Sequence, residues 1–109
     1  MKAVKIFTYN PKNQKSEFEF YALSKGLNSG KPLDVPCPNC FVISCRNVEE
    51  LDVYRSLLFG LWQTKSFHQF LIGSVIPYIR ISDFKNFVFE QATHLKGKEK
   101  VFKNDIRRV

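Results

Sequence analysis

Long hydrophobic runs are missing from this sequence. The longest nearly apolar stretch runs from Leu57 to Trp62, far short of the roughly 20 residues that a membrane-spanning helix needs. The opening residues, MKAVKIFTYN, hold no apolar segment of the length found in secretory signal peptides. We therefore expect a cytoplasmic protein without membrane association.

Cysteine and histidine are scarce. Three cysteines are an odd number, which argues against a disulfide framework. The chain has one CxxC motif, CPNC at residues 37–40, and a zinc site there would need two further ligands. A redox dithiol would need a helix after its first cysteine, whereas a strand is expected here. We expect Cys37 and Cys40 to be loop cysteines with no metal or cofactor, because the other candidate ligands lack a matching spacing: Cys45, His68 and His94.

A catalytic constellation is also missing. Neither His68 nor His94 has an acid or nucleophile partner suggested by spacing. The acidic residues Glu49, Glu50 and Asp52 are better explained as the start of a helix, where the helix dipole favours negative charge. We expect a protein that is not an enzyme.

Aromatic residues and positive charge are plentiful. Eleven Phe, four Tyr and one Trp in 109 residues are enough for a packed single-domain core. The formal net charge is +7. From Lys96 onward the sequence has six basic residues and two acidic ones, Glu99 and Asp105, which gives a net charge of +4. Residues 1–95 therefore carry a net charge of +3. We predict one domain over residues 1–95 and a basic C-terminal tail over 96–109, which either adds affinity for phosphates or only aids solubility.

Local patterns predict a strand and then a helix in the first part of the chain. Residues 3–9 alternate between apolar and polar side chains, as a strand does. Ser16 and Glu19 have the spacing of a capping box, which predicts a helix from about residue 16 to Lys25, stopped by Gly26. Three prolines then indicate a loop over residues 27–40.

The middle of the chain predicts a central strand followed by a helix. Residues 41–45 are nearly continuous in apolar character, which is typical of a strand inside a sheet. Asn47 is a candidate N-cap for the next helix, which continues or kinks near Thr64. Gly60 within that helix costs stability, which suggests close packing against another element.

Further along, residues 75–81 alternate between apolar and polar side chains, which predicts a strand. Pro77 indicates that this strand lies at the edge of the sheet or begins irregularly. Ser82-Asp83 then caps a short helix over 83–87, and residues 87–89 continue it or, as we favour, form a last strand. These elements together predict an α+β fold in which a small mixed sheet packs against two or three helices.

The glycine-containing segment KGLNSGKP at residues 25–32 has some features of a phosphate loop. Its order is wrong, because a phosphate loop follows a strand and its Lys-Ser/Thr pair opens a helix. A positively charged loop with free amides can still hold a phosphate group or a DNA backbone. The alternative, a helix C-cap followed by a turn, stays open.

Residues 57–89 carry a recognisable series of motifs. They are Lys65-Ser66, Phe67, Leu71, Gly73-Ser74, Pro77, Ile79, Ser82-Asp83, Phe84-Lys85 and Val88, with Phe41-Val42-Ile43 as the preceding strand. In this respect the stretch resembles the end of a target-recognition domain from type I restriction specificity subunits. The resemblance implies a target-recognition-domain-like fold and a DNA-binding role. Two features depart from that family: the chain lacks the two long spacer helices, and Glu90 and Gln91 stand where a proline is usual.

The whole chain also resembles a set of small uncharacterised bacterial proteins, through residues 25–32 and 73–80. Proteins of that set tend to be associated with mobile genetic elements. The alternative to DNA binding is therefore a protein-interaction or homodimerising accessory protein of a bacterial mobile element, of unknown function.

The DNA-binding interpretation implies double-stranded DNA as the partner and Arg80 as the candidate base reader, since arginine offers a bidentate fork to guanine or phosphate. An ordinary surface strand, with Arg80 paired to Asp83, is the competing interpretation. The expected nucleic-acid contacts are Arg80, Tyr78, Lys85, Ser74, Lys65, Asn28, Ser29 and Lys31.

Overall fold

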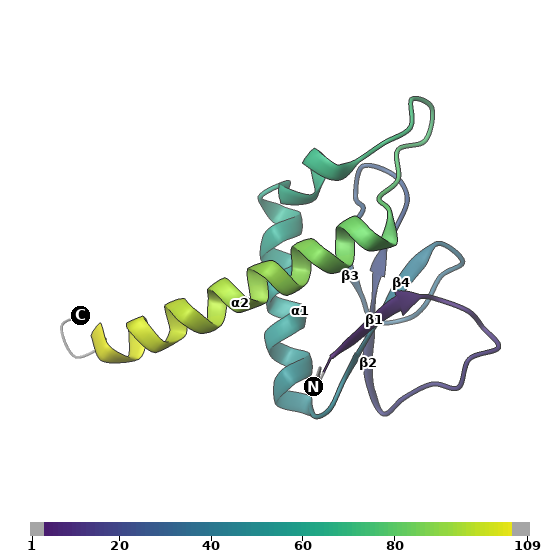
Figure 1. Ribbon diagram of the computed structural model, residues 1–109. Helices are drawn as coiled ribbons and strands as arrows, with labels where there is room; N and C mark the ends of the chain where they lie inside the picture. Colours follow the sequence, from purple (N-terminus) through teal and green to yellow (C-terminus); the bar gives the residue numbers. More distant parts are fainter. Residues whose placement is uncertain (1–3, 106–109) are drawn as a thin grey trace.

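A computed structural model describes the backbone of residues 4–105 and the side chains of residues 4–94. In chain order these residues form β1 (Lys5–Thr8), β2 (Phe18–Leu23), β3 (Pro32–Leu33), β4 (Cys40–Cys45), α1 (Val48–Gln63), the 3-10 helix η1 (Ser66–Phe70) and α2 (Ile81–Asp105). Figure 1 shows the strands as one layer and the helices as another. The α+β class is confirmed. None of the helices in the described part of the chain combines the length and the apolar character needed to cross a membrane.

The sheet has the strand order β1-β4-β2-β3. Every pairing between these strands is antiparallel, so the expected mixed sheet was wrong in this detail. The prediction of a central strand at residues 41–45 is confirmed, because β4 pairs along its length with β2 and with β1. β4 is also covered on both faces, and a strand of this kind is the place where nearly continuous apolar character is expected.

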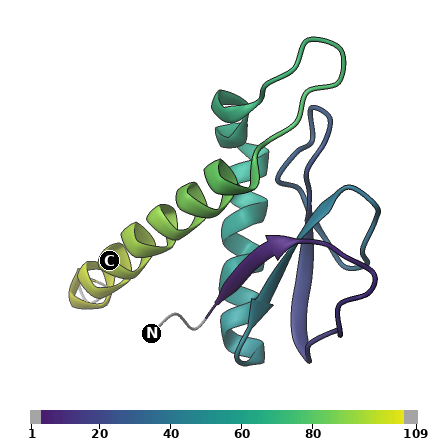
Figure 2. The same cartoon turned by 45° about the vertical axis from the view of Figure 1, so that its right-hand side comes forward.

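The main core lies between one face of the sheet and the helices, which Figures 1 and 2 show on the same side of the strands. Phe84 of α2 is fully buried, and its ring centroid lies 4.6 Å from that of Phe41 and 5.5 Å from that of Phe67. From α1, Leu58 enters the same cluster. A smaller cluster of Tyr21, Cys40 and Val42 lies on the opposite face. Both faces of the central strands are therefore buried.

The start of α1 follows the sequence prediction. The side chain of Asn47 accepts a hydrogen bond of 2.8 Å from the amide of Glu50, which satisfies one of the free amides of the first turn. The helix ends at Gln63, and a left-handed Lys65 separates it from η1. Of the two alternatives near Thr64, continuation or a kink, the structure thus has a break in the helix.

The predicted helix over residues 16–25 was wrong, because this segment contains strand β2. The local signal itself is real: the amide and hydroxyl of Ser16 both donate to the Glu19 carboxylate, at 2.9 and 2.8 Å. Those bonds tighten the turn before a strand instead of capping a helix. All six residues of β2 pair with β4, and this pairing satisfies backbone groups that a helix would also have satisfied. It also buries Phe20 and Ala22. These gains outweigh the local preference of the Ser16–Glu19 turn for a helix.

The predicted strand at residues 75–81 was also wrong. The backbones of Ile72 and Tyr78 exchange two hydrogen bonds of 2.9 Å and close a loop between them. Tyr78 makes only isolated bridges, to Ile72 and Lys25, so no ladder forms in this part of the described chain. The alternating pattern arose from a loop whose apolar residues Val75 and Ile76 face solvent.

The short helix at 83–87 followed by a strand at 87–89 was wrong as well, because α2 is continuous from Ile81 to Asp105. Phe84, Val88 and Ala92 lie four residues apart and are all buried, as expected for one face of a helix.

The boundary expected between residues 95 and 96 falls within α2. The side chains of the basic tail lie outside the described ones.

Gly60 was expected to mark a close contact, and this was wrong: a Cβ atom built there would meet nothing within 4 Å. The close contact is at Gly30, which has a φ of 96° and lies against the ring of Phe67. A Cβ there would lie 2.1 Å from Cδ2 of Phe67. Phe67 is fully buried and has no room to move away.

These two glycines give opposite predictions for the free energy of unfolding. Gly30→Ala should lower it by about 2–4 kcal/mol, through overpacking and the unfavourable positive φ. Gly60→Ala should raise it by about 1 kcal/mol, through helix propensity. Urea unfolding followed by circular dichroism measures both. A neutral Gly30→Ala would contradict the packing of this loop against η1.

Candidate nucleic-acid interface

Segments far apart in the sequence meet at one end of the molecule. The amide of Gly26 donates to the carbonyl of Pro77 at 2.6 Å, and the amide of Ile79 donates to Ser24 at 3.1 Å. Nε2 of His68 lies 3.0 Å from the carbonyl oxygen of Leu27. Figures 1 and 2 show the loop between β2 and β3 and the loop between η1 and α2 side by side, near the C-terminal end of α1. We call residues 24–31 together with residues 60–80 the basic end.

The basic end carries positive charge without any acidic residue. Its two segments contain Lys25, Lys31, Lys65 and Arg80 and no Asp or Glu. Acidic residues gather at the start of α1, where Glu49, Glu50 and Asp52 lie. Asp52 precedes Gly60, the first α1 residue of the basic end, by eight positions, which is a rise of about 12 Å along the helix. Asp52 also lines a surface hollow together with Lys31. The two segments of the basic end therefore carry a local excess of positively charged residues.

Arg80 has the exposure that the DNA-binding interpretation requires. Its side chain is exposed, and among residues 4–94 it forms no ion pair, so the alternative pairing with Asp83 is not observed. Its carbonyl accepts from the amide of Phe84 at 2.9 Å, which places it at the start of α2. Tyr78 is 41% exposed, and Ser74 and Lys65 are exposed as well. These four side chains are all exposed, and they belong to the basic end.

Lys31 and Asn28 also belong to the basic end but have partners there. Nζ of Lys31 lies 5.2 Å from the centroid of the Trp62 ring, an attraction between a cation and an aromatic face. Nε1 of Trp62 donates to the side-chain oxygen of Asn28 at 3.2 Å. The Asn28 oxygen is thus occupied, while the Lys31 ammonium keeps its charge and part of its exposure.

Two of the expected contacts are not exposed side chains of the basic end. Ser29 is 1% exposed and its hydroxyl donates to the carbonyl of Gly26 at 2.7 Å, so it stabilises the loop and is not available to a ligand. Lys85 lies five residues after Arg80 on α2, about 140° around the helix axis. It is exposed on α2 but is not part of the basic end.

The loop at residues 25–32 is not a phosphate loop. It connects strand β2 to strand β3, whereas the sequence analysis expected a helix before it. The amides of Ser29, Gly30 and Lys31 donate to carbonyls within the loop and β2, and Gly26 donates to Pro77. Since these four amides are used internally, they are not available to a phosphate.

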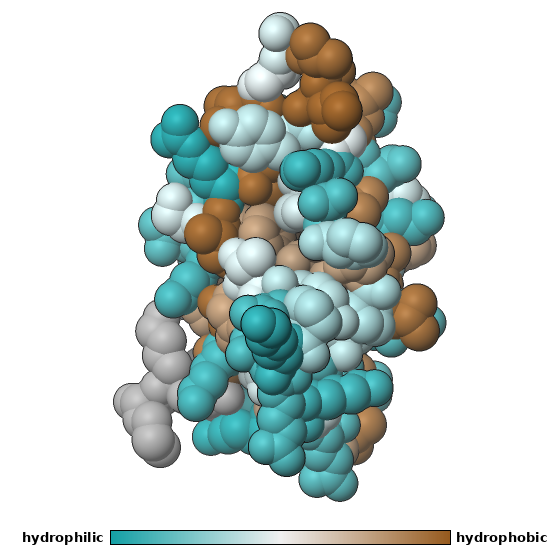
Figure 3. Space-filling view, turned by 90° about the vertical axis from the view of Figure 1, so that its right-hand side faces the viewer, coloured by the Kyte–Doolittle hydropathy of each residue, from teal (hydrophilic) through white to brown (hydrophobic). Residues whose placement is uncertain are grey.

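One feature of the basic end was missed by sequence reasoning. Leu27, Val75 and Ile76 are 66%, 89% and 63% exposed, which is unusual for apolar residues. Figure 3 shows apolar side chains gathered at that end of the molecule. We call these three residues the apolar tip. Lys25 was missed too, although its position beside Gly26 in the loop motif was a usable signal.

The three cysteines are free thiols that differ in burial. In the described part of the chain, no three Cys, His, Asp or Glu side chains are placed to hold a metal ion. Burial raises the pKa of the Cys40 thiol. Burial, with a smaller effect from the charge of Glu50, raises the pKa of Cys45 to about 12. Both thiols stay protonated at neutral pH and are poor nucleophiles.

Thiol reactivity should follow this burial. We expect Ellman's reagent at pH 8 to modify partly exposed Cys37 within minutes, and to modify Cys40 and Cys45 only as fast as the protein unfolds. A Cys37→Ser variant supplies the control, since it should lose the fast phase alone. Rapid reaction of all three thiols in the folded protein would contradict the burial of the central strand.

Comparisons with known proteins identify a family but no activity. A family model described as a family of unknown function (DUF6943) matches residues 6–109. No curated protein and no solved structure gave a significant match. The match confirms the sequence-based resemblance of the whole chain to a family without a known role.

Proposed function

The chain belongs to this family of unknown function, and from its surface we propose that it is a non-catalytic DNA-binding module that contacts phosphates through the basic end. One observation carries this proposal: Lys25, Lys65 and Arg80 are exposed, and they lie in two segments that hydrogen-bond to each other and contain no Asp or Glu. Phosphate contacts from such side chains supply most of the affinity of proteins for duplex DNA.

The side chains suggest a division of roles. Lys25 and Lys65 are exposed point charges, suited to phosphate oxygens of any sequence. Arg80 offers a planar fork that can bind a guanine edge or a phosphate in two places, and Tyr78 beside it can stack or donate a hydrogen bond. Lys65, Ser74, Tyr78 and Arg80 all lie in the stretch that resembles a type I restriction target-recognition domain, which supports the same proposal.

A charge-matched pair of variants tests it. Replacing Lys25, Lys65 and Arg80 by Gln should weaken binding to random duplex DNA about 100-fold at 0.15 M salt and reduce the slope of log K against log salt by about 2.7. Fluorescence anisotropy at several salt concentrations measures both values.

The control variant replaces Lys5, Lys12 and Lys15, which are exposed outside the basic end, by Gln. It has the same net charge and should bind almost as the parent protein does. Equal losses of DNA affinity in the two variants would mean that binding depends only on the net charge of the protein and not on the basic end. Undetectable binding of the parent protein at low salt would eliminate the DNA-binding proposal.

The apolar tip supports a second candidate function. Exposed Val75 and Ile76 are held by a closed loop, and a fixed apolar projection of this kind is common at protein contacts. A homodimer is the simplest case, since symmetric pairing would place two basic ends on one duplex. Under this candidate the chain is a protein-interaction or homodimerising accessory protein of a bacterial mobile element.

Sedimentation equilibrium with a matched pair of double variants tests this candidate. Val75→Ser with Ile76→Ser should convert a dimer to a monomer, because the contact would lose its apolar area. Val35→Ser with Val48→Ser changes residues that are 72% and 56% exposed elsewhere and should leave the mass unchanged. A parent protein that is monomeric at all concentrations would rule out the homodimer.

A further inference from the structure

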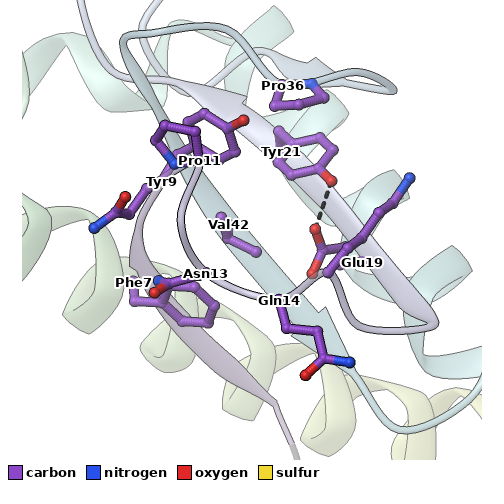
Figure 4. Close-up of a pocket in the computed structure, with 11 residues that line it drawn as sticks. Phe7, Tyr9, Pro11, Asn13, Gln14, Glu19, Tyr21, Pro36 and Val42 are labelled. Carbon is purple, nitrogen blue, oxygen red and sulfur yellow. Dashed lines mark hydrogen bonds between the residues drawn. The ribbon is translucent and has the colours of Figure 1, made fainter.

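The face of the sheet opposite the helices contains a hollow of about 180 Å³. It lies between the loop after β1, the loop before β4 and the face of the strands that the helices do not cover. Figure 4 shows Val42 at its floor, with Phe7, Tyr9 and Tyr21 around it and Glu19 at one side. The apolar tip and the basic end contribute no residue to it.

Aromatic rings form much of the wall. The centroids of Tyr9 and Tyr21 are 6.1 Å apart and their planes meet at 84°, so one ring presents its edge to the face of the other. Phe7 and Tyr9 are partly exposed, which leaves ring surface available to a ligand. The face of an aromatic ring carries partial negative charge and attracts cations.

A carboxylate completes the wall and is held in a fixed position. Glu19 accepts a hydrogen bond of 2.5 Å from the Tyr21 hydroxyl, and it accepts two more from Ser16. Burial alone would raise the pKa of Glu19, but the hydrogen bonds from Tyr21 and Ser16 outweigh this effect and hold it below the usual 4.5. Burial and the bond to Glu19 raise the pKa of Tyr21, so its hydroxyl stays a donor. The site thus contains a negative charge at neutral pH.

From this arrangement we propose that the hollow binds a small alkylated ammonium ion. Rings on several sides favour a cation with apolar substituents, because such a cation loses little hydration when it contacts them. Ordinary pockets for drug-sized ligands have volumes of about 300–1,000 Å³. The hollow therefore fits a head group, such as that of a free quaternary amine or of a methylated lysine side chain.

Lys15 also lines the hollow, and it lies close enough to Glu19 to contribute to the lowered pKa of that carboxyl. Its ammonium therefore competes with an external cation for the same charge. Because Lys15 is exposed, this competition is weak.

Titrations of the full chain followed by ¹H–¹⁵N NMR test the proposal. Choline should shift resonances of residues 7–21 in a saturable way, and its neutral isostere 3,3-dimethylbutan-1-ol should bind at least about tenfold more weakly. A peptide with trimethyllysine is the third arm. Stronger binding of the peptide than of choline assigns the ligand to a protein side chain, and the reverse assigns it to a free amine. Equal binding of choline and its isostere, or no binding of any cation, would overturn the proposal.

Variants separate the aromatic and electrostatic contributions. Tyr9→Leu should weaken choline binding about tenfold, whereas Tyr9→Phe keeps the ring and should bind as the parent protein does. Glu19→Gln should abolish the preference for choline over the neutral isostere, and Lys15→Met should strengthen choline binding about two- to fivefold. If Glu19→Gln fails to fold, the Tyr9 pair decides: equal binding by Tyr9→Leu and Tyr9→Phe contradicts an aromatic cation site.

Discussion

The antiparallel ladder around β4 is the constraint on which the rest of the structure depends. β4 pairs with β2 over six residues on one edge and with β1 over four on the other, so neither edge is free. Because side chains alternate along a strand, Phe41 and Ile43 meet the helices while Val42 meets the loops. A one-residue slip in this register would exchange the two faces and destroy both clusters.

The ladder also separates the two candidate sites. One end of the sheet directs the loop after β2 towards the end of α1, where Lys31 contacts Trp62 and the basic end is assembled. The face away from the helices gathers Phe7, Tyr9 and Tyr21 around a carboxylate. The proposed anion site and the proposed cation site therefore lie in different parts of the protein.

Sequence reasoning succeeded where the signal was local and failed where distant segments competed for a residue. Asn47 caps α1 as expected, because a cap involves residues three apart. The Ser16–Glu19 pair was correctly recognised as hydrogen-bonded, yet a helix did not follow, because pairing with β4 captured β2. Alternation at residues 75–81 indicated a strand, but no partner strand lies beside it in the described chain. Arg80, Lys65, Tyr78 and Ser74 are exposed in spite of that error, whereas Ser29 is buried.

The amino-acid sequence by itself determined the α+β class, the central position of residues 41–45 and the start of α1, since apolar period and cap chemistry act within a few residues. Only the tertiary structure decided that Trp62 meets Asn28, 34 residues away, and that His68 meets Leu27, 41 residues away. The basic end and the aromatic hollow both arise from such long-range contacts. No local pattern specifies them, because a surface site depends on which segments the core brings together.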